Sequence, residues 1–437
     1  MRVALLNPNW TYDGSIYFGC REPHLPTELA CARALLEEAG HEALLLDAHL
    51  YALSDAEVRA RVSAFAPGLT VLTTAPTYLF WRCPPPELRV PRRLVQALAG
   101  AGGTLVAIGP HASTTPRATL RKLGVDVAVL GEPEEVLARL ASATRAEWPS
   151  LLSIAWRTDD DAILVQGQPA VVEMTRIPAL RWTADEIGRH RHHHHRFDTI
   201  PTRPGAEVEA TRGCPYQCTF CNKENFRNGY RKRPLATVLD EVDGLIATGV
   251  EYVYFIDEIF LPDRPLLEAL ACRDVRFGVQ MRIDNWSEEL LDLLGGAGCL
   301  SIEAGVESLT ERGRSLLAKR CKLTTDELTA LLIHAKRRVP FVQANLLDGG
   351  FDDPAHVEAW RATLQQHGVW ANKPVPMFPY PGTPDYRLRW GAPDDEAWER
   401  AHADYLSRYS EFSDIQEERP WPLPELEADP AGEAARG

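Results

Sequence analysis

Short apolar runs alternate with amphipathic segments over residues 1–145. Apolar runs bounded by polar residues are typical of buried strands, and a repeat near 3.6 residues is typical of helices. Glu28–Ala39 fits such a helix, closed by Gly40, and a capping box at Ser54 to Glu57 begins the next. The pattern predicts strands at Val3–Asn7, Glu42–Asp47, Leu69–Thr74, Thr104–Gly109 and Val127–Leu130. This alternation predicts an α/β domain with a doubly wound, Rossmann-like parallel sheet.

The same alternation resumes at Ala206 and continues to about residue 390. Its first helix begins at Pro234 and carries one apolar stripe up to Gly249. Six strands are predicted, at Ala206–Ala210, Tyr252–Ile256, Phe277–Met281, Leu300–Ala304, Phe341–Leu347 and Pro374–Phe378. Six strand–helix units are fewer than the eight of a closed barrel, so we expect a partial (β/α)6 barrel.

The segments beside these two regions have a different composition. Residues 146–205 form a connector in which repeated prolines exclude long helices. The connector contains four adjacent histidines, His192–His195, whose side chains diverge too much to surround one metal ion. A structural or substrate-facing role is therefore favoured for this run. Residues 391–437 are expected to form a short helical cap followed by an acidic, proline-rich tail from Arg419.

Composition narrows the functional class. The chain has 437 residues, 45% of them hydrophobic, and no apolar run approaches the length of about 20 residues needed to cross a bilayer. Met1 to Leu6 is predicted to be a strand rather than a signal peptide, so we expect a cytoplasmic protein without membrane partners. A net charge of −14 argues against nucleic acid and is compatible with a small, cationic substrate. Nine cysteines without a secretory signal indicate a reducing compartment.

Three of the cysteines are clustered directly after the first predicted barrel strand. Cys214, Cys218 and Cys221 have the spacing C-x-x-x-C-x-x-C, which can ligate three irons of a [4Fe–4S] cluster and leave the fourth without a protein ligand. An open iron can hold a small molecule and pass one electron into it. The alternatives are a zinc knuckle, although zinc prefers four ligands paired as C-x-x-C, or three ordinary thiols.

The motif resembles that of the radical S-adenosylmethionine (SAM) superfamily, with Phe220 at the aromatic position before the last cysteine. This resemblance implies that SAM chelates the open iron and is cleaved to a 5′-deoxyadenosyl radical. It also implies a partial barrel core and an external one-electron donor of the flavodoxin or ferredoxin type.

The N-terminal region resembles the cobalamin-binding domain of one radical SAM subclass. The resemblance rests on the segments Gly109 to Pro116 and Gly124 to Glu132. It implies cobalamin contacts at Gly109, His111, Gly131, Glu132 and Tyr78. Because no D-x-H-x-x-G follows the first strand, a histidine ligand to cobalt is not expected; no G-x-G-x-x-G occurs there either, which disfavours a dinucleotide. The alternative is a domain that kept the fold and lost the cofactor.

Catalytic groups of barrels gather at the carboxyl ends of strands, so contacts with SAM are expected there. Asp257 or Glu258, after the second strand, could accept bonds from the SAM ammonium, and Arg282 could clamp its carboxylate. The other candidates follow the fourth and fifth strands: Glu303, Glu307, Ser308, Gln343 and Asn345. Simple alternation places Glu303 and Glu307 on one face of their strand. By the same rule, the side chains of Gln343 and Asn345 face one way on the next strand.

Two radical mechanisms fit these residues. In the first, SAM supplies both the radical and, through cobalamin, a methyl group for carbon of a small natural-product or sugar-like substrate. In the second, the cobalamin domain is vestigial and hydrogen abstraction starts a dehydration or epimerisation, for example of an aminosugar. A non-enzymatic iron–sulfur scaffold is the third reading, and it leaves the strand-end acids unexplained.

Overall fold

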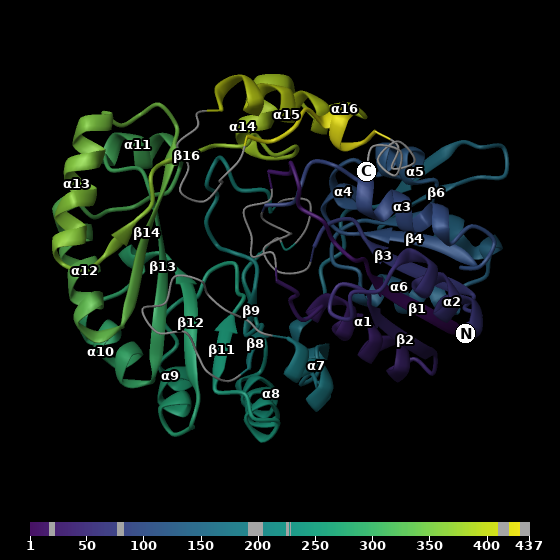
Figure 1. Ribbon diagram of the computed structural model, residues 1–437, viewed down its shortest axis with the longest axis horizontal. Coiled ribbons are helices and arrows are strands. Elements are labelled where there is room, and N and C mark those ends of the chain that lie inside the picture. The colour runs from purple at the N-terminus through teal and green to yellow at the C-terminus, as the bar shows by residue number, and fades with distance from the viewer. Residues whose placement is uncertain are drawn as a thin grey trace.

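The structure is a computed structural model, described over residues 1–16, 22–76, 83–190, 204–223, 227, 229–409 and 419–428. It contains two large sheets that lie side by side, each covered by helices (Figure 1). Helices near the C-terminus run across the top of the view from one sheet to the other. They are α14 (Pro384–Trp390), α15 (Ala397–Arg408) and α16 (Leu423–Leu426).

The N-terminal sheet has the strand order β2-β1-β3-β4-β5-β6-β7. Its strands are β1 (Arg2–Asn7), β2 (Glu42–Asp47), β3 (Leu69–Thr73), β4 (Thr104–Ile108), β5 (Val127–Val129), β6 (Ile154–Arg157) and β7 (Ile163–Gln166). The first five pair in parallel and confirm the predicted doubly wound sheet. The prediction of five strands was incomplete, because β6 and β7 add an antiparallel hairpin from the expected connector. The domain boundary at residue 145 stays a prediction.

Helices cover both faces of this sheet, as its continuously apolar strands require. They are α1 (Thr27–Glu38), α2 (Asp55–Phe65), α3 (Arg89–Ala97), α4 (Pro110–Thr114), α5 (Pro116–Leu123) and α6 (Glu134–Ser142). The capping box predicted at Ser54 and Glu57 is present at the start of α2. Short 3-10 turns at Arg145–Ser150 and Met174–Arg176 and helix α7 (Ala184–Arg189) follow in the connector.

The second sheet is an open barrel with the strand order β15-β14-β13-β12-β11-β8, and β16 pairs with β14. Its strands are β8 (Gly205–Val208), β11 (Tyr252–Phe255), β12 (Arg276–Met281), β13 (Cys299–Glu307), β14 (Phe341–Asp348), β15 (Trp370–Ala371) and β16 (Val375–Pro376). All pairs are parallel. The predicted partial barrel is confirmed, although only β16 lies within the predicted sixth strand, Pro374–Phe378, and β15 precedes it.

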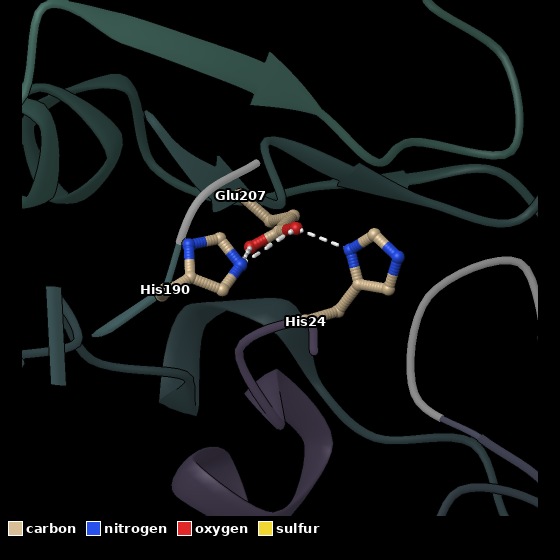
Figure 2. Close-up of side chains that lie close together, drawn as sticks. All are labelled: His24, His190 and Glu207. Atoms are coloured by element: carbon tan, nitrogen blue, oxygen red, sulfur yellow. Dashed lines mark hydrogen bonds and ion pairs between the residues drawn. The ribbon is translucent and has the colours of Figure 1, made fainter. Parts of the chain in front are cut away.

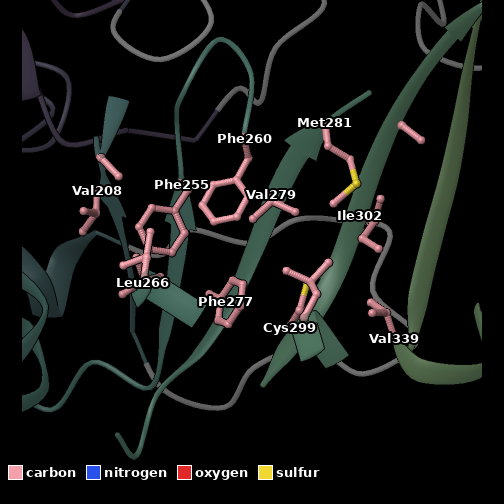
Figure 3. Packing of buried hydrophobic residues seen from close by; sticks show 14 of the residues in the cluster. Val208, Phe255, Phe260, Leu266, Phe277, Val279, Met281, Cys299, Ile302 and Val339 are labelled. Atoms are coloured by element: carbon pink, nitrogen blue, oxygen red, sulfur yellow. The ribbon is translucent and has the colours of Figure 1, made fainter. Parts of the chain in front are cut away.

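Helices lie outside the barrel sheet (Figure 1). They are α8 (Leu235–Ala247), α9 (Arg264–Ala271), α10 (Glu288–Gly296), α11 (Glu311–Leu316), α12 (Thr325–Arg338) and α13 (Pro354–Gln366), with a 3-10 turn at Ile283–Asn285. Figure 3 shows Phe255, Phe277, Val279 and Ile302 packed in the core between this sheet and its helices. Strand residues that alternate with them, such as Tyr254, face the barrel interior.

In the described residues, no helix is long and apolar enough to span a membrane.

Candidate active site

The cysteine loop is closed at its base by a two-residue ladder. Strands β9 (Thr211–Arg212) and β10 (Arg231–Lys232) pair in antiparallel fashion on either side of the loop. Gly213 has a φ of 81°, and a Cβ added there would lie 2.0 Å from the carbonyl oxygen of Gly229. A side chain at this position would therefore displace the loop just before Cys214.

Cys214, Cys218 and Cys221 are half-buried, and none of them forms a disulfide. The Cys221 amide donates to the Cys218 carbonyl at 3.1 Å, which tightens the turn that contains Phe220. The loop is also held from outside, because the amide of Asp385 at the start of α14 donates to the Thr219 carbonyl at 3.0 Å. These thiols are accessible on a backbone that is fixed on both sides.

Positive side chains surround the thiols. Burial raises the pKa of the Cys214 and Cys218 thiols, while the charges of Lys223, Lys319 and Arg282 act in the opposite direction. Lys223 Nζ also donates to the Cys214 carbonyl at 2.5 Å. Cations near Cys214 and Cys218 would offset part of the negative charge that an iron–sulfur cluster brings into a half-buried site.

Arg282 has the geometry of a carboxylate clamp. Its guanidinium pairs with Asp284 at 2.6 Å and stacks over the Tyr216 ring of the cysteine loop, 3.8 Å from the ring centroid. Its Nη1 is buried and has no hydrogen-bond partner among the described residues. One side of the guanidinium fork is therefore available to a ligand beside the cysteines.

Asp257 and Glu258 hold the backbone that leads into the cysteine loop. Asp257 is fully buried and accepts bonds from the Ala210 amide at 2.8 Å and the Thr211 hydroxyl at 2.6 Å. Glu258 accepts a bond from the Gly213 amide at 2.7 Å and pairs with Arg227 at 2.7 Å. Burial raises the pKa of Asp257 to about 7. Both acids position the loop, and their expected contact with SAM stays a prediction.

The candidates on β13 and β14 divide into two groups. Glu303 accepts bonds from Gln280 Nε2 at 3.0 Å and the Tyr254 hydroxyl at 3.4 Å, so it lies on the inner face. Gln343 bonds to Asn345, which confirms that these two side chains face one way.

Glu307 and Ser308 follow an irregularity in β13. The pairing register shifts between Gly305 and Glu307, and Glu307 has a φ of 67°. The shift breaks the strict alternation behind the predicted shared face of Glu303 and Glu307, but the Glu307 carboxylate lies 2.5 Å from where a Cβ on Gly305 would sit. Their shared face stays a prediction. Glu307 pairs with Lys319 at 3.1 Å, and Ser308 donates to Asp352 at 2.9 Å.

The candidates in the N-terminal domain lie at the carboxyl edge of its sheet. Gly109 is the N-cap residue before α4, and the Gly131 amide donates to Ser113 Oγ at 2.9 Å. His111 is buried and stacks on Trp398 of α15, with ring centroids 4.1 Å apart; burial lowers its pKa to about 3. Glu132 forms an ion pair with Arg231. Tyr78 lies outside the described residues.

At the same edge, the hydroxyls of Thr73 and Thr74 are buried and have no hydrogen-bond partner among the described residues. Strand order reverses between β1 and β3, and ligands of doubly wound sheets bind at such a switch point. Unpartnered hydroxyls at this place fit a polar ligand lying across the edge.

Comparison with known proteins agrees with this geometry. Residues 208–357 match the family model described as the radical SAM superfamily. This segment, about a third of the chain, is similar to that superfamily. The matched residues form the radical SAM domain, and they contain the three cysteines and all the predicted SAM contacts.

Similar proteins extend the likeness beyond the radical SAM domain. An anaerobic magnesium-protoporphyrin IX monomethyl ester cyclase of Rubrivivax gelatinosus is 24% identical over 357 residues, 76% of this chain and 60% of that protein. The chain spans about half to two thirds of the length of the curated relatives it matches.

Two solved structures share the fold. TsrM from Kitasatospora setae, a radical SAM methyltransferase with cobalamin and a [4Fe–4S] cluster bound, has a TM-score of 0.69 at 20% identity and covers 88% of this chain and 76% of its own. The cobalamin-dependent SAM radical enzyme OxsB, with aqua-cobalamin and SAM bound, has a TM-score of 0.68 at 14% identity, covering 93% and 66%. The two-part architecture is therefore a known one.

A buried ion network joins the radical SAM domain to the N-terminal sheet. Arg212, two residues before Cys214, contacts Glu209 at 2.6 Å, Glu134 at 2.8 Å and Glu132 at 3.1 Å. Arg231 on β10 pairs with Glu132 at 2.5 Å. Glu132 and Glu134 follow β5, so the carboxyl edge of the N-terminal sheet contacts the base of the cysteine loop directly. Sequence analysis missed this network, since nothing in the chain marks which acids meet Arg212.

Proposed function

We propose that this protein is a radical SAM enzyme that transfers a methyl group to a carbon atom of a small-molecule substrate, with cobalamin held at the N-terminal sheet. The observation that carries the proposal is the Arg212 network, which fixes the ligand-binding edge of that sheet against the cysteine loop. A group bound at this edge of the sheet would then lie on the side that faces the cysteine loop.

The residues present fit each cofactor. The cysteines supply three thiolates on a fixed loop, and Arg282 offers a free Nη1 to a carboxylate such as that of SAM. Thr73 and Thr74 offer unpartnered hydroxyls to a polar ligand such as the amide-rich cobalamin. When bound, cobalamin supplies the methyl-carrying chemistry, as the likeness to TsrM and OxsB suggests.

The substrate is proposed to lie on the inner face of the barrel. Glu303 is nearly buried there and is held by Gln280 and Tyr254, so its carboxylate is positioned before any substrate arrives. A fixed acid in a site of low dielectric favours a cationic group. We therefore expect a small substrate that carries an amine.

The test is the turnover of SAM by the enzyme, purified anaerobically with cobalamin supplied, in the presence of a chemical reductant and a panel of small amines as candidate methyl acceptors. Methyl transfer gives S-adenosylhomocysteine together with 5′-deoxyadenosine, whereas 5′-deoxyadenosine alone favours dehydration or epimerisation. Cys218→Ala should lose both iron and 5′-deoxyadenosine formation. Cys272→Ala is the matched control, because Cys272 is exposed and lies outside the loop, and it should keep both. Formation of 5′-deoxyadenosine by Cys218→Ala would refute the cluster assignment.

A further inference from the structure

Three buried side chains, those of His24, His190 and Glu207, lie close together (Figure 2). His24 lies in the segment before α1, His190 directly follows α7, and Glu207 lies on β8. His24 Nδ1 is 2.7 Å from Glu207 Oε1, and His190 Nε2 is 3.1 Å from Oε2 and 3.2 Å from Oε1. All three side chains are at most 4% exposed. Segments from the N-terminal domain, the connector and the barrel thus converge on one carboxylate.

The hydrogen bonds of His190 assign its proton. Its Nδ1 lies 3.0 Å from the carbonyl oxygen of Gly205, which can only accept, so Nδ1 carries the hydrogen. In the neutral imidazole, Nε2 then presents a lone pair, and that lone pair points at the carboxylate of Glu207. Two lone pairs at 3.1–3.2 Å repel each other unless a positive charge lies between them. A second proton or a metal ion supplies that charge.

We propose that His24, His190 and Glu207 bind a divalent transition-metal ion, in the first place Zn²⁺. Two imidazoles with one carboxylate are a known ligand set of zinc. The three ligand atoms lie within 4.8 Å of one another. Metal–ligand bonds of about 2.0–2.1 Å in a tetrahedron place ligand atoms about 3.3 Å apart. The distance from His190 Nε2 to the Glu207 carboxylate is already close to this value. The distance from His24 Nδ1 to the same carboxylate would increase by about 0.6 Å when a metal ion binds.

Two further features fit a metal centre. The Gly205 carbonyl holds His190 by its Nδ1–H, which is the usual way in which a metal-binding histidine is oriented. A divalent cation also offers the buried carboxylate more compensation than a shared proton does, since it attracts the carboxylate and both imidazoles at once. These three ligands, found among the described residues, leave one position of a tetrahedral zinc site for a further ligand.

The position of Glu207 gives the site a structural role. Glu207 is paired in register with Tyr254, so both side chains lie on the inner face of the barrel sheet. Strand β8 is the edge strand of the open barrel and leads into the cysteine loop. A metal ion here would tie the first barrel strand to the N-terminal domain and the connector. This role is independent of the proposed methyl transfer.

Metal analysis of the anaerobically purified holoenzyme tests the proposal. The protein is prepared without a polyhistidine tag, and zinc and iron are quantified per chain. We expect about one zinc in addition to the cluster iron. Glu207→Gln and His190→Gln, which keep the size of the side chains, should lower the zinc content about ten-fold or more. His334→Gln is the matched control, because this imidazole also pairs with two acids, Asp292 and Glu288, and it should keep the zinc.

X-ray absorption at the zinc edge separates this site from others. Nitrogen and oxygen neighbours at about 2.0–2.1 Å support it, whereas sulfur at about 2.3 Å would place zinc on the cysteines and overturn it. All variants keep His192–His195, so zinc held by that run would persist in Glu207→Gln and would also overturn the proposal. A holoenzyme with full cluster iron that neither contains zinc nor takes it up against a competing chelator refutes the metal site. Iron content and SAM cleavage report on the proposed function separately.

Discussion

Replacing Arg212 by methionine removes the centre of the buried ion network while keeping most of the apolar stem. Arg212 is 1% exposed, and it is the cation that contacts Glu134. Glu132 keeps Arg231, and Glu209 keeps Arg227. The substitution therefore leaves one buried carboxylate, that of Glu134, without its compensating charge.

The expected loss of stability follows from this one uncompensated carboxylate. Removing one partner of a buried ion pair costs about 3–5 kcal/mol, because the remaining charge stays desolvated. The unfolding entropy of a chain of 437 residues is about 0.9 kcal/mol per kelvin, at about 2.1 cal/mol/K per residue. The melting temperature should thus fall by about 3–5 °C if the chain unfolds as one unit.

The assay is anaerobic calorimetry of the holoenzyme, with two comparisons. Arg264→Met removes ion pairs with Glu289 and Glu268 from a side chain that is 48% exposed, and it should change stability by no more than about 1 kcal/mol. Glu134→Gln in the Arg212→Met background should recover part of the loss, because it removes the orphaned charge. A melting temperature unchanged in Arg212→Met, or no recovery in the double variant, would refute this account of the network.

Two further predictions concern Asp257 and Arg282, which lie beside the cysteine loop. Burial raises the pKa of Asp257 to about 7, so this carboxyl favours folding at low pH and loses that contribution as pH rises towards 7. The free energy of unfolding of Asp257→Asn, measured in urea, should therefore decline less between pH 5.5 and 7 than that of the parent, by about 1 kcal/mol per pH unit; parallel profiles would contradict this. Arg282→Lys keeps the positive charge but loses the fork of the guanidinium, so its dissociation constant for SAM should rise about ten-fold. Arg276→Lys is the control, because Arg276 is exposed at the start of β12, and this variant should bind SAM normally. Equal SAM affinity in both variants would argue against the clamp.

The sequence was sufficient for elements that follow from local pattern. Apolar strands and capped helices predicted both sheets, and the cysteine spacing predicted the site at the end of β8. The hairpin of β6 and β7 joined the N-terminal sheet rather than a separate connector, because short antiparallel strands carry no signal for the sheet they will extend. The register shift between Gly305 and Glu307 was not predicted, because alternation of side chains alone does not reveal a bulge.

Contacts between distant segments were not predictable. His24 and Glu207 are separated by 183 positions, and Arg212 and Glu132 by 80. Each of these charged residues, taken alone, is compatible with an exposed surface position. Only the packing of the two domains shows that they are buried and which partners they meet.

The most direct test of the central claim is the cofactor content of the protein expressed anaerobically with cobalamin supplied. The claim is that the N-terminal sheet presents a cobalamin site to the cysteine loop. It predicts about four irons and about one cobalt per chain. It also predicts that Thr74→Val, which removes an unpartnered hydroxyl, lowers the cobalt and leaves the iron unchanged. Four irons with no cobalt in the parent protein would contradict the claim and leave the N-terminal domain as a scaffold for a radical enzyme without cobalamin.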